Sequence, residues 1–515
     1  MGDSPADRPV QKLWSLNKSY AWAAGITVVI ANAAAFISNI EKIQQFIFNI
    51  FGLYHSLIFH TWFKWFLVIG MLLAYSVLAL YVYWTYFQTK EKRLRLTYCA
   101  LAVLCGFGIC ALNLGLVQAR QPAAGPLLRQ ASVSLSRAVL LQQTPNGGFR
   151  FWQVGPNTET QVWTTAQCLF AVLSASKAQN TEQIKTTNVK TTNDVTESAQ
   201  AIRAAFDYVE RLRLPAGGGW GYMEGLDWAV TEIIAWVALA KQASLYSGNR
   251  AAIWPEPEAA KIVQSLARDL TLLIERQHDD GGWSPIHKTN DASHLRTYST
   301  AIALWALIEA RQNKDLPEDL AKKLDQSIAR GARWLLGTYH IYPDGDGGWL
   351  ANPSHRESVE RFVGLTAQTL FILSQAEARY DFLKTNFNYQ GMKKRFLVSA
   401  VGDKGTPSSL LFRDISTNER VHDSDRYLRG TSYTAESSTF LWYPWSLVLA
   451  SVLNEDSLLD DLSRAHASTL LRAILNRSEG MIRFVQRDPV IYPTAENLFS
   501  ISFFLQRNAV KNVRS

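Results

Sequence analysis

Two hydrophobic patterns divide the chain. Between residues 20 and 118 apolar residues form long runs, whereas from residue 127 onward shorter apolar segments alternate with polar ones and with glycine-containing turns. Long runs are typical of helices that are apolar all round, and alternating segments of helices with one buried face. We therefore expect an N-terminal tail over 1–19, a transmembrane domain over 20–118, a linker over 119–126 and a helical domain over 127–515.

The apolar runs predict membrane spans. Segment 62–87 carries one charge, close to its start, and as a helix it would extend about 39 Å, more than the roughly 30 Å of the hydrocarbon layer. Segment 97–118 is uncharged, and 20–40 is a third candidate. Segment 43–60 is polar enough to be either a span or an interfacial helix. An integral protein of the bacterial inner membrane, with the lipid bilayer as partner, follows from this pattern.

The flanking charges leave the topology open. Three spans place the helical domain outside the cell and four place it inside, and both arrangements put seven Lys or Arg residues inside and five outside. The positive-inside rule therefore does not decide between them. We favour a cytoplasmic helical domain.

A repeated segment organises the second part of the chain. It begins at Thr165-Ala166 and returns at intervals of 66, 69, 66, 68 and 60 residues. Most copies keep an apolar residue at the fifth position and Phe or Trp at the sixth. The later copies begin at Thr231, Thr300, Thr366, Thr434 and Thr494. A period of this length indicates a repeat architecture.

A Gly-Gly-aromatic turn precedes each of the first four copies, at 147–149, 218–220, 281–283 and 347–349. Paired glycines interrupt helices, and a second helical pattern comes before each turn. Each unit is thus predicted to be a helix, a turn and a helix. Six units predict an all-α fold in which six hairpins close into an (α/α)6 toroid, with the Thr-Ala helices as its inner ring.

The turn at Gln277–Trp283, together with the Thr-Ala segment that follows it, resembles the repeats of squalene and terpene cyclases and of protein prenyltransferase β subunits. The resemblance covers residues 127–508. It implies an α/α toroid around a central cavity, and an isoprenoid, lipid or other amphiphile as ligand. It does not by itself imply an activity, because one fold hosts many functions.

The chemistry of those families is not expected here. Class II cyclases of this kind place their acid directly before the Thr-Ala pair, and no residue at that position is acidic. The six residues are Thr164, Val230, Ser299, Leu365, Tyr433 and Pro493. The prenyltransferase zinc site needs an Asp two residues before a Cys, whereas Ala166 precedes Cys168. We therefore expect neither standard cyclisation nor a metal or other cofactor.

Polar residues near the starts of the inner helices are the candidate site. Glu436 and Glu496 occupy the same repeat position, so we predict both, with Asp227, as catalytic residues. The predicted ligand-binding residues are Glu159, Glu232, Glu360, Trp163, Trp228, Tyr298, Tyr433 and Tyr492. Carboxylates at helix N-termini also simply stabilise helices, which leaves each role open. The net charge of +8 is diffuse, so no nucleic-acid partner is expected.

Three functions fit these features. The first is a membrane-anchored toroid that binds an isoprenoid, lipid or amphiphile. The second is an enzyme with altered carboxylates, namely a cyclase-, lyase- or glycan-acting toroid. The third is a non-catalytic sensor or interaction module coupled to a membrane effector in bacterial defence or signalling. An apolar cavity would favour the first, two converging carboxylates the second, and a filled centre the third.

Overall fold

The computed structural model describes residues 124–514, except for 152–158, 184–191, 216–217, 222–227, 248–249, 287–289, 344, 355–362, 402–441, 477, 479–481 and 483–490. The chain divides into two units at residue 110, and all described residues belong to the second. The predicted tail and all four apolar segments between residues 20 and 118 lie outside the described residues.

The described part is almost entirely helical. Six of its helices form an inner ring: α5 (Val162–Gln183), α7 (Thr231–Leu245), α10 (Thr297–Ala310), α12 (Val363–Glu377), α16 (Trp442–Leu453) and α19 (Tyr492–Arg514). The outer helices are α4 (Ala124–Leu140), α6 (Thr192–Arg211), α9 (Glu256–Glu275), α11 (Glu318–Gly337), α14 (Phe387–Val401) and α17 (Asp461–Leu475). Short elements connect them: α8 (Arg250–Ile253), η3 (Ala292–His294), α13 (Asp381–Lys384) and an antiparallel pair, β1 (His340–Ile341) with β2 (Gly347–Gly348).

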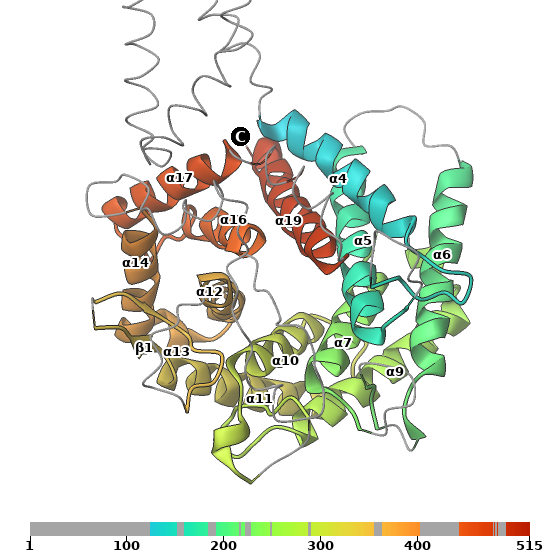
Figure 1. Cartoon of the computed structure of the whole chain (residues 1–515), viewed down its shortest axis with the longest axis horizontal. Coiled ribbons are helices and arrows are strands. Elements are labelled where there is room, and N and C mark those ends of the chain that lie inside the picture. The colour runs from blue at the N-terminus through green and yellow to red at the C-terminus, as the bar shows by residue number, and fades with distance from the viewer. Residues whose placement is uncertain are drawn as a thin grey trace, which may run out of the picture. The chain divides into compact units, whose positions relative to one another are not determined.

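The inner helices close a ring. Each one packs against the next in chain order, and α19 returns to pack against α5 (Figure 1). The outer helices surround this ring, for example α9 against α7 and α11 against α10. The prediction of a closed α/α toroid is confirmed for the described residues.

Burial explains the two helix classes. In α7 and α10 nearly every described side chain is buried, because inner helices contact both their ring neighbours and the outer layer. In α11 the buried residues follow a helical spacing along one face, at Leu320, Leu324 and Ile328. The charged residues of α11 lie on its solvent side, as an outer helix requires.

Hydrogen bonds explain why the turn and the Thr recur together. The backbone N–H of the turn's aromatic residue donates to the hydroxyl of the Thr that marks the inner helix. The pairs are Phe149 with Thr165 (3.0 Å), Trp283 with Thr300 (2.9 Å) and Trp349 with Thr366 (3.2 Å). Gly281 has a φ of 103°, and a Cβ there would lie 2.5 Å from the Arg330 carbonyl oxygen. A side chain at this position is excluded both by conformation and by space.

The register of α7 differs from the predicted one. The Thr231 hydroxyl donates to the carbonyl of Ser284 at 2.6 Å, as the Thr297 hydroxyl does to that of Leu350 at 2.6 Å. Thr231 is thus equivalent to Thr297, which lies one turn before the Thr of its own repeat. Trp236 consequently sits one turn nearer the start of its helix than the repeat spacing predicts. Tertiary contacts set this register, because the local sequence pattern is compatible with both alignments.

The predicted membrane location is corrected. Within the part of the chain that the structure describes, no helix combines the length and the apolar character needed to cross a bilayer. The structure therefore does not support the prediction of an integral membrane protein.

Candidate functional site

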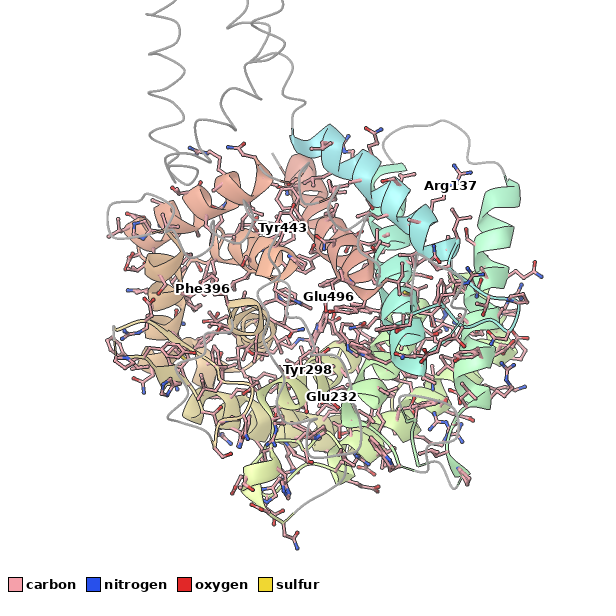
Figure 2. The ribbon with its side chains drawn as sticks, viewed as in Figure 1. Arg137, Glu232, Tyr298, Phe396, Tyr443 and Glu496 are labelled. Atoms are coloured by element: carbon pink, nitrogen blue, oxygen red, sulfur yellow. The ribbon has the colours of Figure 1, made fainter. Side chains whose placement is uncertain are left out.

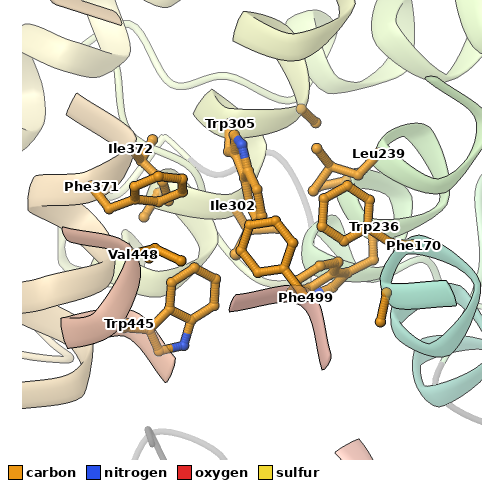
Figure 3. Close-up of a cluster of buried hydrophobic side chains, with 14 of the residues drawn as sticks. Phe170, Trp236, Leu239, Ile302, Trp305, Phe371, Ile372, Trp445, Val448 and Phe499 are labelled. Carbon is orange, nitrogen blue, oxygen red and sulfur yellow. The ribbon is translucent and has the colours of Figure 1, made fainter. Parts of the chain in front are cut away.

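Aromatic side chains fill the centre of the ring. They are Phe170, Trp236, Trp305, Phe371, Trp445 and Phe499, here called the aromatic floor (Figure 3). The Trp305 ring contacts all the others, with centroid distances between 5.1 and 5.8 Å. Most of these contacts are edge-to-face or tilted, the arrangements that aromatic pairs favour. The floor separates the N-terminal from the C-terminal half of the inner helices.

Polar side chains line the N-terminal side of the floor. Gln167, Gln368 and Glu496 each lie three residues before a floor aromatic, which places them one turn away on the same helix face. Glu232, Tyr298 and Ser299 extend this group on α7 and α10. We call these six residues the polar layer. All six are buried, with exposed fractions of at most 8%.

Glu496 sits directly on the floor. The indole N–H of Trp445 donates to its Oε2 at 3.2 Å. Burial raises the pKa of the Glu496 carboxyl to about 8, and the Trp445 hydrogen bond offsets only part of this. At neutral pH Glu496 is therefore a neutral acid that can donate a proton.

Glu232 occupies a different environment. The Ser299 hydroxyl donates to its Oε1 at 2.5 Å. Burial lowers the pKa of the Arg276 guanidinium, and the negative charge of Glu232 offsets part of this, which places Arg276 within electrostatic reach of Glu232. A hydrogen-bond donor and a nearby cation both stabilise negative charge at this position.

Tyr298 lies within electrostatic reach of both carboxyls. Burial raises its pKa well above the usual value, and the charges of Glu496 and Glu232 raise it further. The indole N–H of Trp236 donates to its hydroxyl at 3.2 Å. Figure 2 shows Glu232, Tyr298 and Glu496 close to the middle of the ring. The structure thus brings two carboxyls and a phenol together over the aromatic floor.

Aromatic residues continue this region toward the helix N-termini. Trp163 and Tyr492 stand near the starts of neighbouring helices α5 and α19, and their ring centroids are 5.5 Å apart. Tyr492 is close enough to Tyr298 for its charge to influence that phenol. The carboxyls are therefore flanked by aromatic faces on the N-terminal side as well as on the floor.

The predicted site residues separate into three groups. Glu496, Glu232, Tyr298, Trp163 and Tyr492 gather around the ring centre. Glu159 is exposed and accepts a hydrogen bond from Gln161 at 3.2 Å, while Trp228 is half-buried before α7. Outside the described residues lie Glu436, Asp227, Glu360 and Tyr433, for which the predicted roles stay predictions.

Several residues of this region were not predicted. Gln167 and Gln368 share the repeat position of Glu496, so the signal was present in the sequence. Trp236 occupies the sixth position of its repeat, as four other floor aromatics do, whereas Trp445 was missed because it lies eleven residues after Thr434 rather than five. In α16 the place of Glu496, three residues before the floor aromatic, belongs to Trp442.

Metal binding has no visible basis in the described residues. They contain no group of three or more His, Cys, Asp or Glu side chains positioned to hold an ion. Burial raises the pKa of the Cys168 thiol far above its usual value, which disfavours the thiolate that metal binding needs.

No protein-family model and no curated protein sequence matches the chain. Among solved structures, an inactive variant of the α-1,6-mannanase GH76A of Salegentibacter sp. HEL1_6, in complex with α-1,6-mannotriose, is 11% identical with a TM-score of 0.44, covering 74% of this chain and 99% of that one. A family 76 glycoside hydrolase from a bovine Bacteroides thetaiotaomicron strain is 11% identical with a TM-score of 0.46, covering 75% and 78%. The cellobiose 2-epimerase of Spirochaeta thermophila DSM 6192 is 14% identical with a TM-score of 0.43, covering 76% and 99%.

These TM-scores are too low for the likenesses to carry an argument about this chain. The predicted resemblance to squalene and terpene cyclases and to prenyltransferase β subunits is corrected: the structures matched here are named as glycoside hydrolases and a sugar epimerase.

Proposed function

We propose that the toroid is a glycan-acting enzyme in which Glu496 is the general acid. The observation that carries the proposal is the difference between two carboxyls that both act electrostatically on Tyr298. Glu496 is held neutral by burial, whereas Glu232 receives a hydrogen bond from Ser299 and lies near a guanidinium. Such a pair divides naturally into a proton donor and a charged partner.

The acid strength selects glycoside chemistry over cyclisation. An acid with a pKa of about 8 is far too weak to protonate a carbon–carbon double bond, but a carboxylic acid with a raised pKa is what glycosidases use to protonate a leaving oxygen. Glu496 donates its proton to the glycosidic oxygen as the C–O bond breaks, and a water molecule then adds to the sugar carbon and returns a proton to the Glu496 carboxylate. Glu232 stabilises the positive charge that develops on the sugar ring. A lyase acting on acidic sugars fits less well, because the negative charge at Glu232 repels an anionic substrate.

A non-catalytic ligand-binding module is the second candidate. The observation that favours it is the aromatic floor, which fills the centre of the ring. In that case the polar layer would bind a ligand without turnover. The two candidates differ in whether Glu496 is needed for a reaction or only for binding.

The test is turnover of neutral oligosaccharides by the purified full-length chain. The panel includes α-1,6-mannotriose and cellobiose, and release of reducing sugar is measured. Glu496→Gln should lower kcat by about 10²–10⁴-fold, the usual contribution of a positioned acid. Activity should also fall as the pH rises through about 8, because the acid must be protonated.

Glu309→Gln is the matched control. Glu309 is a second glutamate that accepts from a floor indole, Trp305, at 3.4 Å, and burial raises its pKa. It lies one turn past Trp305, on the other side of the floor. Its replacement should leave kcat unchanged. Equal activity of Glu496→Gln and the wild type, or no turnover by either, would overturn the proposed function.

A further inference from the structure

Two glutamine amides in the polar layer have no partner within the described residues. Gln167 is 2% exposed and Gln368 is fully buried, and neither the oxygen nor the nitrogen of either amide makes a hydrogen bond in that part of the chain. Buried polar groups in native proteins are nearly always hydrogen-bonded, because leaving one unmade is costly. Two such amides at the same repeat position are therefore unusual.

Gln277 shows how this fold treats a structural glutamine. It is also 2% exposed, yet its amide nitrogen donates to the carbonyls of Gly281 (2.8 Å) and Ser327 (3.0 Å). Its amide oxygen accepts from the Ser327 hydroxyl (2.7 Å) and from Arg330 (2.6 Å). The amide thus ties a turn to the neighbouring outer helix. Gln167 and Gln368 have no comparable structural role among the described residues.

The ring places the two amides opposite each other. Around it α5 and α12 are separated by α7 and α10 on one side and by α16 and α19 on the other. Gln167 and Gln368 each lie one turn before a floor aromatic, Phe170 and Phe371. They therefore stand at one level on opposite walls, with the aromatic floor beneath them and Glu496 on the wall next to Gln167.

We propose that these two amides bind the hydroxyl groups of an uncharged sugar ring seated on the aromatic floor. An amide offers both donors and an acceptor, which matches a hydroxyl that both donates and accepts. Aromatic faces suit the apolar face of such a ring, and a few fixed polar groups give orientation. The negative charge that Ser299 and Arg276 stabilise at Glu232 disfavours an anion. The proposal extends the proposed function to its substrate class, but binding does not depend on turnover.

Binding is tested on the purified full-length chain with D-glucose, D-mannose, cellobiose and α-1,6-mannotriose as neutral probes and D-glucuronate as the anionic counterpart. Saturation-transfer NMR and calorimetry are expected to show that at least one neutral sugar binds. Gln167→Leu and Gln368→Leu should each weaken that binding about tenfold or more, as the loss of hydrogen bonds to the ligand predicts. Binding of none of the neutral probes, or D-glucuronate binding as tightly as they do, would overturn the proposal.

Thermal melts distinguish a ligand-binding role of the two amides from a structural role, because the two roles predict opposite changes in Tm. If the amides serve a ligand, Leu at positions 167 and 368 removes unsatisfied polar groups, so Tm should stay the same or rise. Gln277→Leu is the matched control and should lower Tm, because it breaks the four hydrogen bonds described above. A fall in Tm for Gln167→Leu and Gln368→Leu as large as that for Gln277→Leu would overturn the proposal.

Failure of this inference and failure of the proposed function give different results. Sugar binding that needs both amides, without turnover, would contradict the proposed enzymatic function and support the binding site. Turnover with unchanged KM in both leucine variants would support the enzymatic function and contradict the binding role of the amides.

Discussion

The toroid contains two kinds of buried polar region. One is a charge cluster between α6, α7 and α9, formed by Glu210, Arg213, Lys241, Ser265 and Asp269. The other is the polar layer at the ring centre. In the cluster every charged side chain has a partner of opposite charge. In the polar layer two glutamine amides have no hydrogen-bond partner within the described residues. The first arrangement serves the fold, and the second is available to a ligand.

Lys241 is the centre of the charge cluster. Its ammonium is fully buried and lies 2.7 Å from Asp269 Oδ2 and 2.8 Å from the Ser265 hydroxyl, and it also pairs with Glu210. Although burial raises the pKa of Glu210, Lys241 and Arg213 together lower it to about 2. The carboxylate is thus held charged by its neighbours. Glu496, which receives an indole hydrogen bond from Trp445 and faces no cation within hydrogen-bond distance among the described residues, is held neutral by burial.

The comparison predicts its largest effect at Lys241. Lys241→Met leaves the buried Asp269 carboxylate with Arg213 alone, and breaking a buried ion network by removing one partner costs about 3–5 kcal/mol. Urea unfolding followed by circular dichroism measures the loss.

Lys322→Met is the control for that measurement. Lys322 pairs with Glu318 at 2.9 Å on an exposed face of α11, where a salt bridge contributes less than about 1 kcal/mol. Similar losses for the two variants would show that the buried cluster does not stabilise the fold in the way described.

The next effect is a pH dependence that originates in the polar layer. The folded pKa of Glu496, about 8, is higher than its ordinary value of 4.5. The contribution of the protonated Glu496 carboxyl to the free energy of unfolding is complete below pH 4.5. It is lost as the pH rises toward 8, because only the unfolded chain releases the proton in that interval. The slope approaches about 1.4 kcal/mol per pH unit.

Glu496→Gln removes this titration. The free energy of unfolding of the wild type, relative to the variant, should therefore fall by about 3–4 kcal/mol between pH 5 and pH 8. Denaturant unfolding of both proteins across that range measures the difference. Parallel pH profiles would mean that Glu496 is ionised in the folded state and would weaken its contrast with Glu232.

The smallest effect concerns the joint between turn and inner helix. Thr300→Val removes the acceptor for the Trp283 amide and should cost about 0.5–1.5 kcal/mol, the net value of one hydrogen bond. Thr469→Val is the control, because that hydroxyl is exposed and bonds only within its own helix, to the Ala465 carbonyl. A change in kcat for Thr300→Val would be unexpected, since Thr300 holds the turn and lies outside the polar layer.

The sequence by itself determined the toroid. The Thr-Ala segments and the Gly-Gly-aromatic turns are local signals that depend on backbone conformation and on one short hydrogen bond, so their period could be read directly. The aromatic at the sixth position was also visible, and five of the six floor residues occupy it in the predicted register, namely Phe170, Trp236, Trp305, Phe371 and Phe499. Glu496, Glu232 and Tyr298 were recognised as candidates by their place near helix starts.

Only the tertiary structure decided how those positions combine. The register of α7 depends on contacts with the next repeat, and the place of Trp445, eleven residues after Thr434, could not be read from the spacing. The raised pKa of Glu496 also arises from burial by neighbouring helices, so it could not be predicted from the local sequence. A repeat shows which residues share a level of the ring. Which of them lose water and which acquire partners depends on packing across the ring, between residues hundreds of positions apart in the chain.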